Sequence, residues 1–498
     1  MPRARDPLAA IVLAAGKGTR MRSARAKVLH EVAGRPLAYY PVKRALELGA
    51  HPLVVVVGYQ AEAVRAALSA ALPGAPLRFA LQAEQRGTAH AVLKARRALK
   101  GQGGAVLILS GDTPLLTTEV LAEVVAARAR ARAAIAFATM VPASPQGYGR
   151  VVRDPGGAPV RVVEEKDATR AERALREVNA GLYCVEAGFL WNALGRVGRE
   201  NAQGEYYLPD LVALAAERSR AVAVPLPAAL AAGVNDRAEL ARVGRALVLR
   251  LAEAHARSGV TIEDPARFDC DEGVLLAPDV VVEPGVRLRG HTRVGRGTVV
   301  GAGCILTDAV VEGDVTLLPY TVVEASRISA GAIVGPFARL RPGSEIGEGA
   351  HVGNFVEMKK TRLGPRSKAN HLTYLGDAQV GRGVNVGAGT ITCNYDGETK
   401  HPTRIGDGVF VGSDSILVAP IEIGDGAYIA AGSTLTESVP PGALALGRAR
   451  QVNKEGWVAR RKRSRQWKGA AAPRPVRMRA TRPPAAKGSS AGRRSPSP

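Results

Sequence analysis

A six-residue repeat of aliphatic side chains constrains the fold of this chain more than any other feature. Neither a helix, which repeats near 3.6 residues, nor a single strand, which repeats near 2, gives a period of six. The period fits a parallel β-helix in which three short strands form a coil of about eighteen residues with the aliphatic side chains inward. Glycine follows many of these positions, and we expect it to supply positive φ angles at tight corners. The repeat comprises Val334, Leu340, Ile346, Val352 and Met358, then Ile405, Val411, Leu417, Ile423, Ile429 and Leu435.

The repeat is interrupted between its two stretches by residues that a regular scaffold does not need. The interruption contains two polar and aromatic segments, residues 371–377 and 387–397. His371 lies in the first segment, and Asn394 and Tyr395 lie in the second. We therefore expect a site at the interruption, with a structural corner residue as the alternative for His371.

The N-terminal half alternates strand-like and helical patterns, which indicates an α/β domain. Apolar runs predict strands at 9–15, 53–57, 77–81, 105–109 and 134–139, and helical patterns lie at 38–48, 61–71, 89–99 and 119–132. Such alternation is typical of a mostly parallel, Rossmann-like sheet with helices on both faces. Ligands of these sheets bind beyond the carboxyl ends of the strands.

Several candidate ligand residues follow the predicted strands. The loop from Gly16 to Arg20 is neither a Walker A motif nor a dinucleotide fingerprint, so it is either a phosphate-binding loop or a plain turn. Asp112 follows a buried strand and suits Mg²⁺ on a triphosphate, with a helix cap or Asx-turn as the alternative. Asn235 precedes an amphipathic connecting helix at 237–256 and is a natural N-cap for it.

Composition limits the partners and the compartment. The segment 459–498 has 13 Lys or Arg and no acidic residue, so removing it reduces the net charge from +23 to +10. Because this tail has no interleaved aromatics beyond Trp467, we expect no specific nucleic-acid binding. Four cysteines without metal-ligand spacing indicate reduced thiols, and no apolar run is long enough to span a bilayer, so a cytoplasmic location is expected. Four regions are predicted: an N-terminal domain (1–236), a linker helix (237–261), a β-helix (262–456) and a basic, mostly disordered tail (457–498).

The motifs resemble those of a known enzyme family over about residues 9–457. The segment Leu13–Met21 with Lys27 is similar to the signature of sugar-1-phosphate nucleotidyltransferases, although Ala26 stands where that family usually carries Pro. The segments 354–360, 371–377, 387–397, 409–415 and 453–457 resemble the bacterial bifunctional enzymes that join an N-acetylglucosamine-1-phosphate uridylyltransferase to a glucosamine-1-phosphate acetyltransferase. The resemblance implies a left-handed β-helix of hexapeptide repeats and a homotrimer with its acetyltransferase sites at subunit interfaces.

For uridylyl transfer, the resemblance implies that Arg20 and Lys27 neutralise the triphosphate and that Asp112 and Asn235 bind Mg²⁺. Gln82, Gly87 and Thr88 would contact uracil, and Gly149, Glu164 and Asn179 would hold N-acetylglucosamine. The remaining contacts to UTP would come from Leu13, Ala14, Ala15, Gly16, Ser110 and Gly111.

For acetyl transfer, the resemblance implies that His371 is the general base, because an ordinary histidine pKa suits a neutral base near pH 7. Glu357 is expected to orient its ring. The sugar phosphate would be bound by Arg341, Lys359, Tyr374 and Asn385, with Lys400 as a further cation. Acetyl-CoA would be bound by Ala388, Asn394, Tyr395, Ser413, Ala431 and Arg448.

The expected function is thus a two-step synthesis of UDP-N-acetylglucosamine from glucosamine 1-phosphate, acetyl-CoA and UTP. Two alternatives remain open. One is a nucleotidyltransferase whose β-helix only oligomerises or regulates, and the other is a nucleic-acid-binding scaffold that uses the basic tail.

Overall fold

The computed structural model of the chain describes residues 7–463. Its contacts divide the chain into two compact units, Met1–Gly447 and Arg448–Pro498. The second unit contains α10 (Trp457–Arg463). Most of the predicted basic tail, from residue 464 onward, lies outside the described residues.

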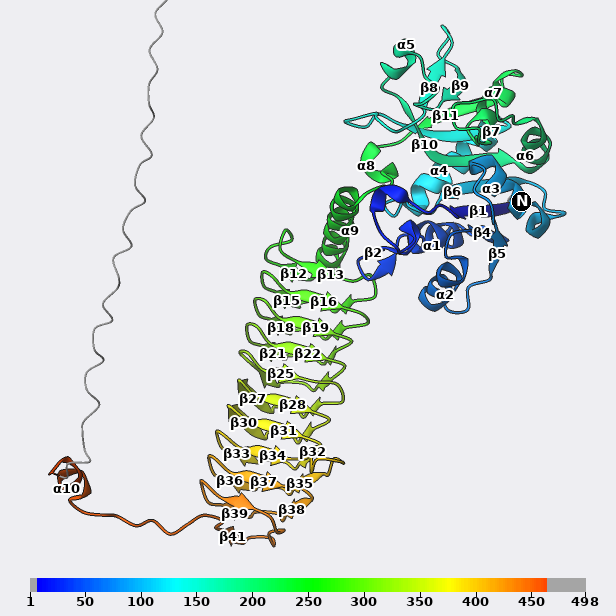
Figure 1. Cartoon of the computed structure of the whole chain (residues 1–498). Coiled ribbons are helices and arrows are strands. Elements are labelled where there is room, and N and C mark those ends of the chain that lie inside the picture. Colours follow the sequence, from blue (N-terminus) through cyan, green and yellow to red (C-terminus); the bar gives the residue numbers. More distant parts are fainter. Residues whose placement is uncertain (1–6, 464–498) are drawn as a thin grey trace, which may run out of the picture. The chain divides into compact units, whose positions relative to one another are not determined.

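A nine-stranded sheet forms the N-terminal part of the first unit (Figure 1). Its strands are β1 (Leu8–Ala14), β4 (Leu53–Val57), β5 (Leu77–Leu81), β6 (Ala105–Ser110), β7 (Ile135–Met140), β8 (Arg150–Arg153), β9 (Pro159–Val163), β10 (Val178–Glu186) and β11 (Ala221–Pro225). The main order is β11-β7-β10-β6-β1-β4-β5, and β8 pairs with both β9 and β10. Because β10 runs antiparallel to both β6 and β7, the sheet is mixed, with parallel pairs on either side of β10.

Helices cover both faces of this sheet, as the alternating pattern predicted. Alternate residues of β1 enter different cores: Val12 packs in the cluster that contains residues of α1 and α4, and Ile11 packs in the cluster that contains residues of α3 and α7. The helices are α1 (Tyr39–Glu47), α2 (Ala61–Ala71), α3 (Thr88–Ala95), α4 (Thr118–Arg130), α5 (Arg170–Arg173), α6 (Ala187–Ala193), α7 (Asp210–Ala216), α8 (Ala228–Ala231) and α9 (Arg237–Arg257). Short 3₁₀ turns are η1 (Thr19–Met21), η2 (Lys27–Leu29), η3 (Arg96–Leu99) and η4 (Leu194–Arg196), and β2 (Glu31–Val32) pairs with β3 (Arg35–Pro36) in a small hairpin.

The C-terminal part of the first unit is a solenoid of three parallel sheets, consistent with the predicted left-handed β-helix (Figure 1). The first solenoid sheet contains β12 (Thr261–Ile262), β15 (Val281–Val282), β18 (Val299–Val300), β21 (Thr316–Leu317), β24 (Ile333–Val334), β27 (His351–Asn354), β30 (Lys368–His371), β33 (Asn385–Val386), β36 (Phe410–Val411), β39 (Tyr428–Ile429) and β41 (Leu444–Ala445). The second contains β13 (Asp269–Cys270), β16 (Arg287–Arg289), β19 (Ile305–Thr307), β22 (Val322–Glu324), β25 (Arg339–Leu340), β28 (Glu357–Lys359), β31 (Tyr374–Gly376), β34 (Ile391–Cys393), β37 (Ile416–Val418) and β40 (Thr434–Leu435). The third contains β14 (Leu275–Leu276), β17 (Arg293–Val294), β20 (Val310–Val311), β23 (Arg327–Ile328), β26 (Glu345–Ile346), β29 (Arg362–Leu363), β32 (Ala378–Val380), β35 (Thr403–Ile405) and β38 (Ile421–Ile423).

The aliphatic repeat points inward, but the expected interruption is milder than its sequence suggests. All eleven residues of the repeat are buried, and so are Ala369, Leu375 and Val386 within the interruption. The coils continue through the interruption, but at one corner consecutive inward residues are five positions apart and not six, as Leu375 and Val380 are. This shorter spacing shifts the phase of the repeat. At this corner Asp377, two residues after Leu375, has a positive φ of 49°. The true insertion is the loop at 394–402, between β34 and β35.

The expected positive φ occurs at Gly335, which follows Val334 and has a φ of 108°, but not at several other glycines that follow inward aliphatics. The predicted reason was a positive φ, yet Gly353 and Gly412 are absent from the positive-φ residues of the described chain. A Cβ on Gly353 would collide with the Asn370 carbonyl of the next coil, and one on Gly412 would lie 2.5 Å from the Ala431 nitrogen. These glycines therefore allow close stacking of successive coils.

Candidate active sites

The loop that follows β1 brings its backbone against Lys27. Gly18 has a φ of 71°, and a Cβ there would lie 2.5 Å from the Cβ of Lys27. The carbonyl of Leu13 accepts a hydrogen bond from the Gly111 nitrogen at 2.9 Å, and that of Ala15 accepts one from the Tyr59 nitrogen at 3.1 Å. The glycine-rich loop and the end of β6 are thus held side by side at the carboxyl edge of the sheet.

Four of the predicted polar residues meet at this edge. Lys27 Nζ forms an ion pair with Asp112 and lies 3.4 Å from Asn235 Oδ1, while Arg20 donates to the same Oδ1 at 2.8 Å. The side chains of Lys27 and Asp112 are each 17% exposed, so water screens this pair only partly. Two cations and two oxygen ligands from distant parts of the sequence therefore form one cluster.

Asn235 is free to join this cluster because its neighbour caps the helix. The N-cap of α9 is Asp236, whose side chain accepts from the Glu239 nitrogen at 2.8 Å, and not Asn235 as the sequence suggested. The Glu239 carboxylate in turn accepts from the Asn235 nitrogen at 2.7 Å and fixes its backbone. Glu239 was missed at the sequence level, although its spacing from the cap is that of a capping box.

The pair of oxygens from Asp112 and Asn235 fits a magnesium ion. Mg²⁺ is usually held by one or two protein oxygens, water and substrate phosphates, and not by a full protein cage. No group of three His, Cys, Asp or Glu side chains suited to a metal occurs within residues 7–463. The donor set is therefore compatible with the predicted metal.

The residues predicted to contact uracil lie at the start of α3. Gln82 is buried, and its Nε2 lies 3.1 Å from both the Gly87 carbonyl and His90 Nδ1. Gly87 has a φ of 103°, and the Thr88 hydroxyl accepts from the Leu208 nitrogen at 2.9 Å. Gln85, which the sequence reading passed over, donates to the Ala15 carbonyl at 2.8 Å and ties this segment to the glycine-rich loop.

A cavity of about 1440 Å³ lies beside the charged cluster. Arg20, Tyr148 and Glu164 line it together with residues of α9. Burial raises the pKa of Glu164, and the nearby charges of Asp167, Asp210 and Glu205 raise it further. The cavity thus offers a carboxyl group with a tendency to be protonated, next to the expected phosphate site.

Of the other two predicted sugar contacts, Gly149 lies beside Glu164, whereas Asn179 forms hydrogen bonds with residues of its own strand. Gly149 lies against Glu164, since a Cβ there would be 3.3 Å from Oε1. Asn179 donates to the Tyr183 hydroxyl at 2.6 Å and accepts from the Gly181 nitrogen at 3.1 Å. The Ser110 hydroxyl points to the Gly181 carbonyl at 3.5 Å. Neither Gly149 nor Asn179 is among the residues that line the cavity.

In the solenoid, the predicted sugar-phosphate residues project mainly from the second sheet. Arg341 donates to Glu357 at 2.9 Å, and Lys359 lies near the Lys400 ammonium, whose hydrogen bond lowers the pKa of Lys359. Tyr374 follows on the next coil, opposite Glu357. Asn385, in contrast, lies on the first sheet in β33.

His371 ends β30 and is exposed at the corner between the first and second sheets. Its Nδ1 lies 3.2 Å from Asn354 Oδ1 on the preceding coil. Glu357, which we expected to orient the ring, is paired with Arg341 instead. An amide oxygen at Nδ1 favours the tautomer with its proton there and leaves Nε2 free to accept a proton.

The predicted acetyl-CoA contacts line up along the same corner of successive coils. The Asp414 nitrogen donates to the Ala388 carbonyl at 2.7 Å, and the Gly432 nitrogen donates to the Ser413 carbonyl at 2.8 Å. Ala431 precedes Gly432 in the last of these corners. Arg448 belongs to the second compact unit.

The inserted loop carries Asn394 and Tyr395. Asn394 is buried and donates to Asp377 at 2.5 Å, whereas the Tyr395 side chain is 58% exposed. Asp396 accepts from His401 at 2.6 Å and holds the loop as a compact hairpin. Asp377 was not selected at the sequence level, although it closes the 371–377 segment.

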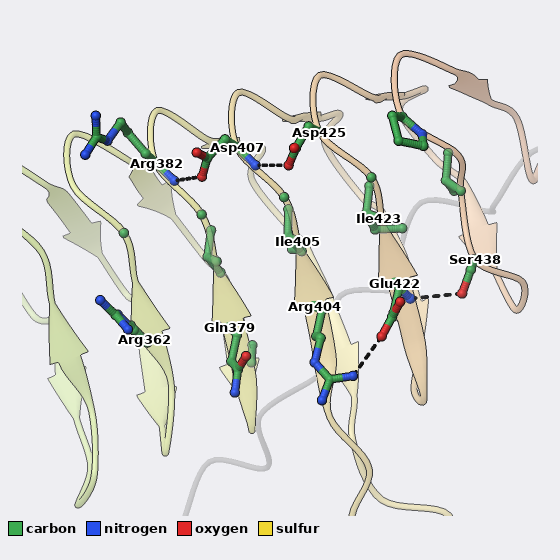
Figure 2. A pocket seen from close by; sticks show the side chains of 18 of the residues that line it. Arg362, Gln379, Arg382, Arg404, Ile405, Asp407, Glu422, Ile423, Asp425 and Ser438 are labelled. Carbon is green, nitrogen blue, oxygen red and sulfur yellow. Dashed lines mark hydrogen bonds and ion pairs between the residues drawn. The ribbon is translucent and has the colours of Figure 1, made fainter.

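A second cavity, of about 1210 Å³, lies on the third solenoid sheet (Figure 2). Arg404 donates to Glu422 at 2.7 Å, and Arg362 and Gln379 project from neighbouring strands. None of the predicted site residues lines it. Apart from Arg448, the candidate acetyltransferase residues thus lie on the first two sheets, at the corner between them and in the inserted loop.

None of the helices within residues 7–463 is long and apolar enough to cross a membrane.

Two family models match the chain. A MobA-like NTP transferase domain matches residues 10–181, and the bacterial transferase hexapeptide (six repeats) matches residues 402–437. A protein of Anaeromyxobacter dehalogenans strain 2CP-C named bifunctional protein GlmU is 68% identical over 96% of this chain and 98% of its own length. Proteins of the same name from Sorangium cellulosum and Geobacter sulfurreducens are 52% and 48% identical over 92% of this chain and 97% and 99% of their own lengths. This chain belongs to the bifunctional GlmU family.

Proposed function

We propose that the chain makes UDP-N-acetylglucosamine in two consecutive steps. The solenoid transfers an acetyl group from acetyl-CoA to glucosamine 1-phosphate, and the N-terminal domain transfers a uridylyl group from UTP to the product and releases pyrophosphate. Family membership assigns the uridylyltransferase and acetyltransferase activities and a role in cell-wall synthesis. The observation that carries the uridylyl assignment is the cluster of Arg20, Lys27, Asp112 and Asn235.

Uridylyl transfer needs positive charge and exact placement more than covalent catalysis. The phosphate of N-acetylglucosamine 1-phosphate attacks the α-phosphorus of UTP, and the bond to pyrophosphate breaks. Lys27 and Arg20 neutralise the triphosphate as negative charge moves onto the leaving group. Asp112 and Asn235 would hold Mg²⁺, which supplies further positive charge to the phosphates when bound. Glu164 and Gly149 would hold the sugar in the adjoining cavity.

Acetyl transfer needs one base, because the amine of glucosamine 1-phosphate is an ammonium ion in solution. Nε2 of His371 removes a proton, and the amine attacks the thioester carbonyl. The tetrahedral intermediate then collapses, the C–S bond breaks, and the CoA thiolate leaves and takes up the second proton, which the nitrogen loses as the amide forms. Asn354 keeps the imidazole in the tautomer that this step requires.

The acetyltransferase residues support a site shared between copies of the chain. Arg341, Lys359 and Tyr374 project from the second solenoid sheet, whereas Asn385 projects from the first. The first and second solenoid sheets are different faces of one three-sided solenoid. One small substrate would therefore contact residues of both sheets most directly if the first sheet of one copy packed against the second sheet of another copy. A closed ring of such head-to-tail contacts is a cyclic oligomer, and we propose the homotrimer of the family.

Exposed aromatic side chains at the same corner favour such packing. Tyr320, Phe337 and Phe355 stack on successive coils with centroid separations of 5.3 and 5.5 Å. Their exposed fractions are 56%, 49% and 56%, and Leu372 extends the row with 64%. An apolar row of this kind is typical of a surface that another protein covers.

The first test separates the two activities within the full chain. Wild-type protein given glucosamine 1-phosphate, acetyl-CoA, UTP and Mg²⁺ should form UDP-N-acetylglucosamine. His371→Ala should abolish acetyl transfer and retain uridylyl transfer from supplied N-acetylglucosamine 1-phosphate. Survival of acetyl transfer in this variant would exclude His371 as the base.

The second test asks whether two copies share a site. Asn385→Ala and Lys359→Ala each disable one face, and the two variants are co-expressed with different tags and purified as mixed oligomers. In a mixed trimer, about one third of the shared sites should have both faces intact, which restores acetyl transfer. A site built within one copy would give no restoration.

A nucleotidyltransferase with an inactive solenoid remains the alternative. The His371–Asn354 contact and the buried Asn394–Asp377 pair oppose it, since a plain scaffold needs neither. Absence of acetyl transfer in the wild-type full chain would favour this alternative.

A further inference from the structure

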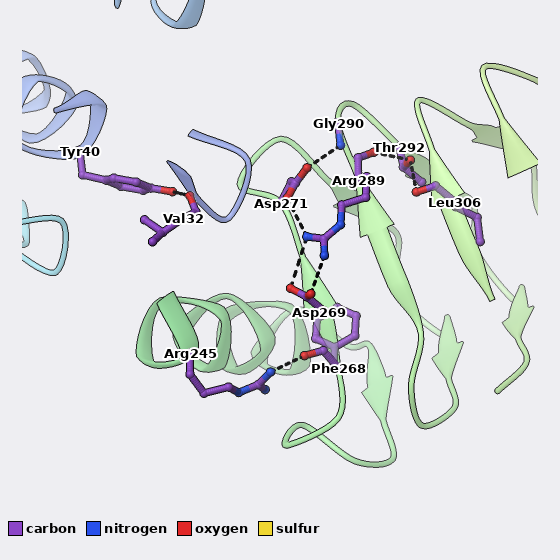
Figure 3. Close-up of polar contacts among 10 residues, drawn as sticks. All are labelled: Val32, Tyr40, Arg245, Phe268, Asp269, Asp271, Arg289, Gly290, Thr292 and Leu306. Carbon is purple, nitrogen blue, oxygen red and sulfur yellow. Dashed lines mark hydrogen bonds and ion pairs between the residues drawn. The ribbon is translucent and has the colours of Figure 1, made fainter. Parts of the chain in front are cut away.

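The hairpin β2–β3 of the N-terminal domain rests on the first coil of the solenoid (Figure 3). Its turn is formed by Ala33 and Gly34, with φ angles of 44° and 70°. The Ala33 carbonyl accepts from the Glu272 nitrogen at 3.0 Å. A Cβ on Gly34 would lie 2.5 Å from Cγ of Asp271, so only glycine allows the turn to lie this close to the coil.

The same hairpin follows the short 3₁₀ turn that begins with Lys27. Lys27 opens η2, which ends at Leu29, and β2 starts two residues later. The hairpin is closed against this turn, because the Leu37 nitrogen donates to the His30 carbonyl at 2.9 Å and the Ala38 nitrogen donates to the Val28 carbonyl at 3.2 Å. A displacement of the hairpin is therefore transmitted to the segment that carries Lys27.

Buried charges hold the solenoid side of this contact. The Glu272 side chain is 7% exposed and accepts from Lys43 of α1 at 2.6 Å. Burial acts to lower the pKa of Lys43, but the hydrogen bond and charge of Glu272 outweigh it and raise that pKa. Asp271 accepts from Arg289 at 3.0 Å and from the Gly290 nitrogen at 2.8 Å, which fixes its carboxylate under Gly34.

The other side of the hairpin is also closely packed. Tyr40 donates to the Val32 carbonyl at 2.6 Å. Val32 meets Gly244 of α9, where a Cβ would lie 3.3 Å from Val32 Cγ1. Arg245 on the same helix donates to the Phe268 carbonyl of the first coil at 2.7 Å. The hairpin is thus enclosed by α1, α9 and the first coil, and each of them fixes its position.

We infer that Glu272 and Asp271, which lie in the solenoid, are positioning residues for uridylyl transfer in the other domain. They hold the Ala33–Gly34 turn and, through the hairpin, set the place of Lys27 relative to Asp112 and the phosphates of UTP. Displacements of about 1 Å at a catalytic group can cost up to a hundredfold in rate. This inference rests on the proposed role of Lys27 in uridylyl transfer.

The test uses the full chain and measures both activities on each variant. Glu272→Gln removes the charge that holds Lys43, and Gly34→Ala pushes the turn away from Asp271. Both should lower kcat of uridylyl transfer about tenfold, with a smaller change in KM for N-acetylglucosamine 1-phosphate, which binds away from the hairpin. Acetyl transfer should be unchanged. Glu312→Gln, which removes a solenoid carboxylate paired with Arg327, is the matched control and should leave both activities unchanged.

Charge reversal separates positioning from general stability. Glu272→Lys should lower uridylyl transfer, and adding Lys43→Glu should recover most of it, because the pair is restored with opposite sign. Unchanged uridylyl transfer in Glu272→Gln and Gly34→Ala would overturn the inference and leave the proposed function intact. Parallel loss of acetyl transfer would also overturn it, since that would indicate a damaged solenoid. Absence of uridylyl transfer in the wild type would overturn both the inference and the proposed function.

Discussion

Replacing Asn354 by aspartate tests whether His371 is the base of acetyl transfer. The wild-type contact joins a neutral amide oxygen to Nδ1 of the imidazole at 3.2 Å. Asn354→Asp keeps the shape and the acceptor but adds a full negative charge at this distance. The charge favours the imidazolium ion, which is the form that cannot accept a proton from the amine.

The size of the effect follows from the distance and the exposure of the ring. His371 is exposed, so the dielectric constant of water applies, and two unit charges at this separation interact by about 1.3 kcal/mol. One pH unit corresponds to about 1.4 kcal/mol. The acidic limb of the kcat/KM profile should therefore move up by about one pH unit. On the acidic limb the variant should be several-fold slower than the wild type, and at the alkaline end of the profile the two should be nearly equal.

The assay follows release of the CoA thiol between pH 5.5 and 9. Gln379→Glu is the matched control, because it adds the same charge on the third solenoid sheet, away from His371. This control should keep the wild-type profile. An unmoved acidic limb in an active Asn354→Asp protein would show that His371 does not supply the base. A shift of equal size in Gln379→Glu would show that net charge, and not the contact, is responsible.

Three further outcomes are expected. Asp112→Ala leaves Lys27 without its ion-pair partner and should reduce uridylyl transfer about a hundredfold or more in a pyrophosphate-release assay, while acetyl transfer stays unchanged. Glu164→Gln should have a higher thermal midpoint than the wild type above about pH 5. Folding raises the pKa of the Glu164 carboxyl, so the wild-type protein loses stability as the pH rises through that pKa and the buried carboxyl ionises. At about pH 3.5 the two midpoints should agree, and a higher midpoint of the variant at low pH would contradict the prediction. Leu340→Ala should lower the free energy of unfolding by about 3 kcal/mol in denaturant titration, since this side chain is fully buried in the solenoid.

The solenoid was predictable because its sequence signal is local and repeated. Each inward residue is recognised from its neighbours six positions away, and all of those named are buried. The spacing of five was not predictable in the same way. A corner can shorten by one residue when the chain adopts a positive φ at a residue such as Lys360 or Asp377. Aspartate is a weak signal of this conformation, and lysine gives none. A slip in the period was therefore mistaken for a break, although the coils continue through it.

The sequence suggested candidate residues for the acetyl-transfer site, but it did not predict which side chains they contact. His371 stood out by type and by its neighbours in the sequence. Glu357 was expected to orient it because a carboxylate is the common partner of a catalytic imidazole, yet Arg341 on the preceding coil takes that carboxylate. Asn354 fills the place because it is stacked directly on His371 in the first solenoid sheet. Which residues stack depends on coil length, and coil length depends on the corners.

Asn235 shows how one position decides between a structural and a chemical role. Its sequence context, a polar residue before an amphipathic helix, fits a cap as well as a ligand. In the structure Asp236 provides the cap, and so the Asn235 side chain faces Arg20 and Lys27. The Glu239 carboxylate then fixes the Asn235 backbone from the first turn of the same helix. Helix α9 thus begins beside the proposed uridylyl site, and farther along it Arg245 donates to the Phe268 carbonyl of the first solenoid coil. The connecting helix therefore contacts both the proposed uridylyl site and the first coil of the solenoid.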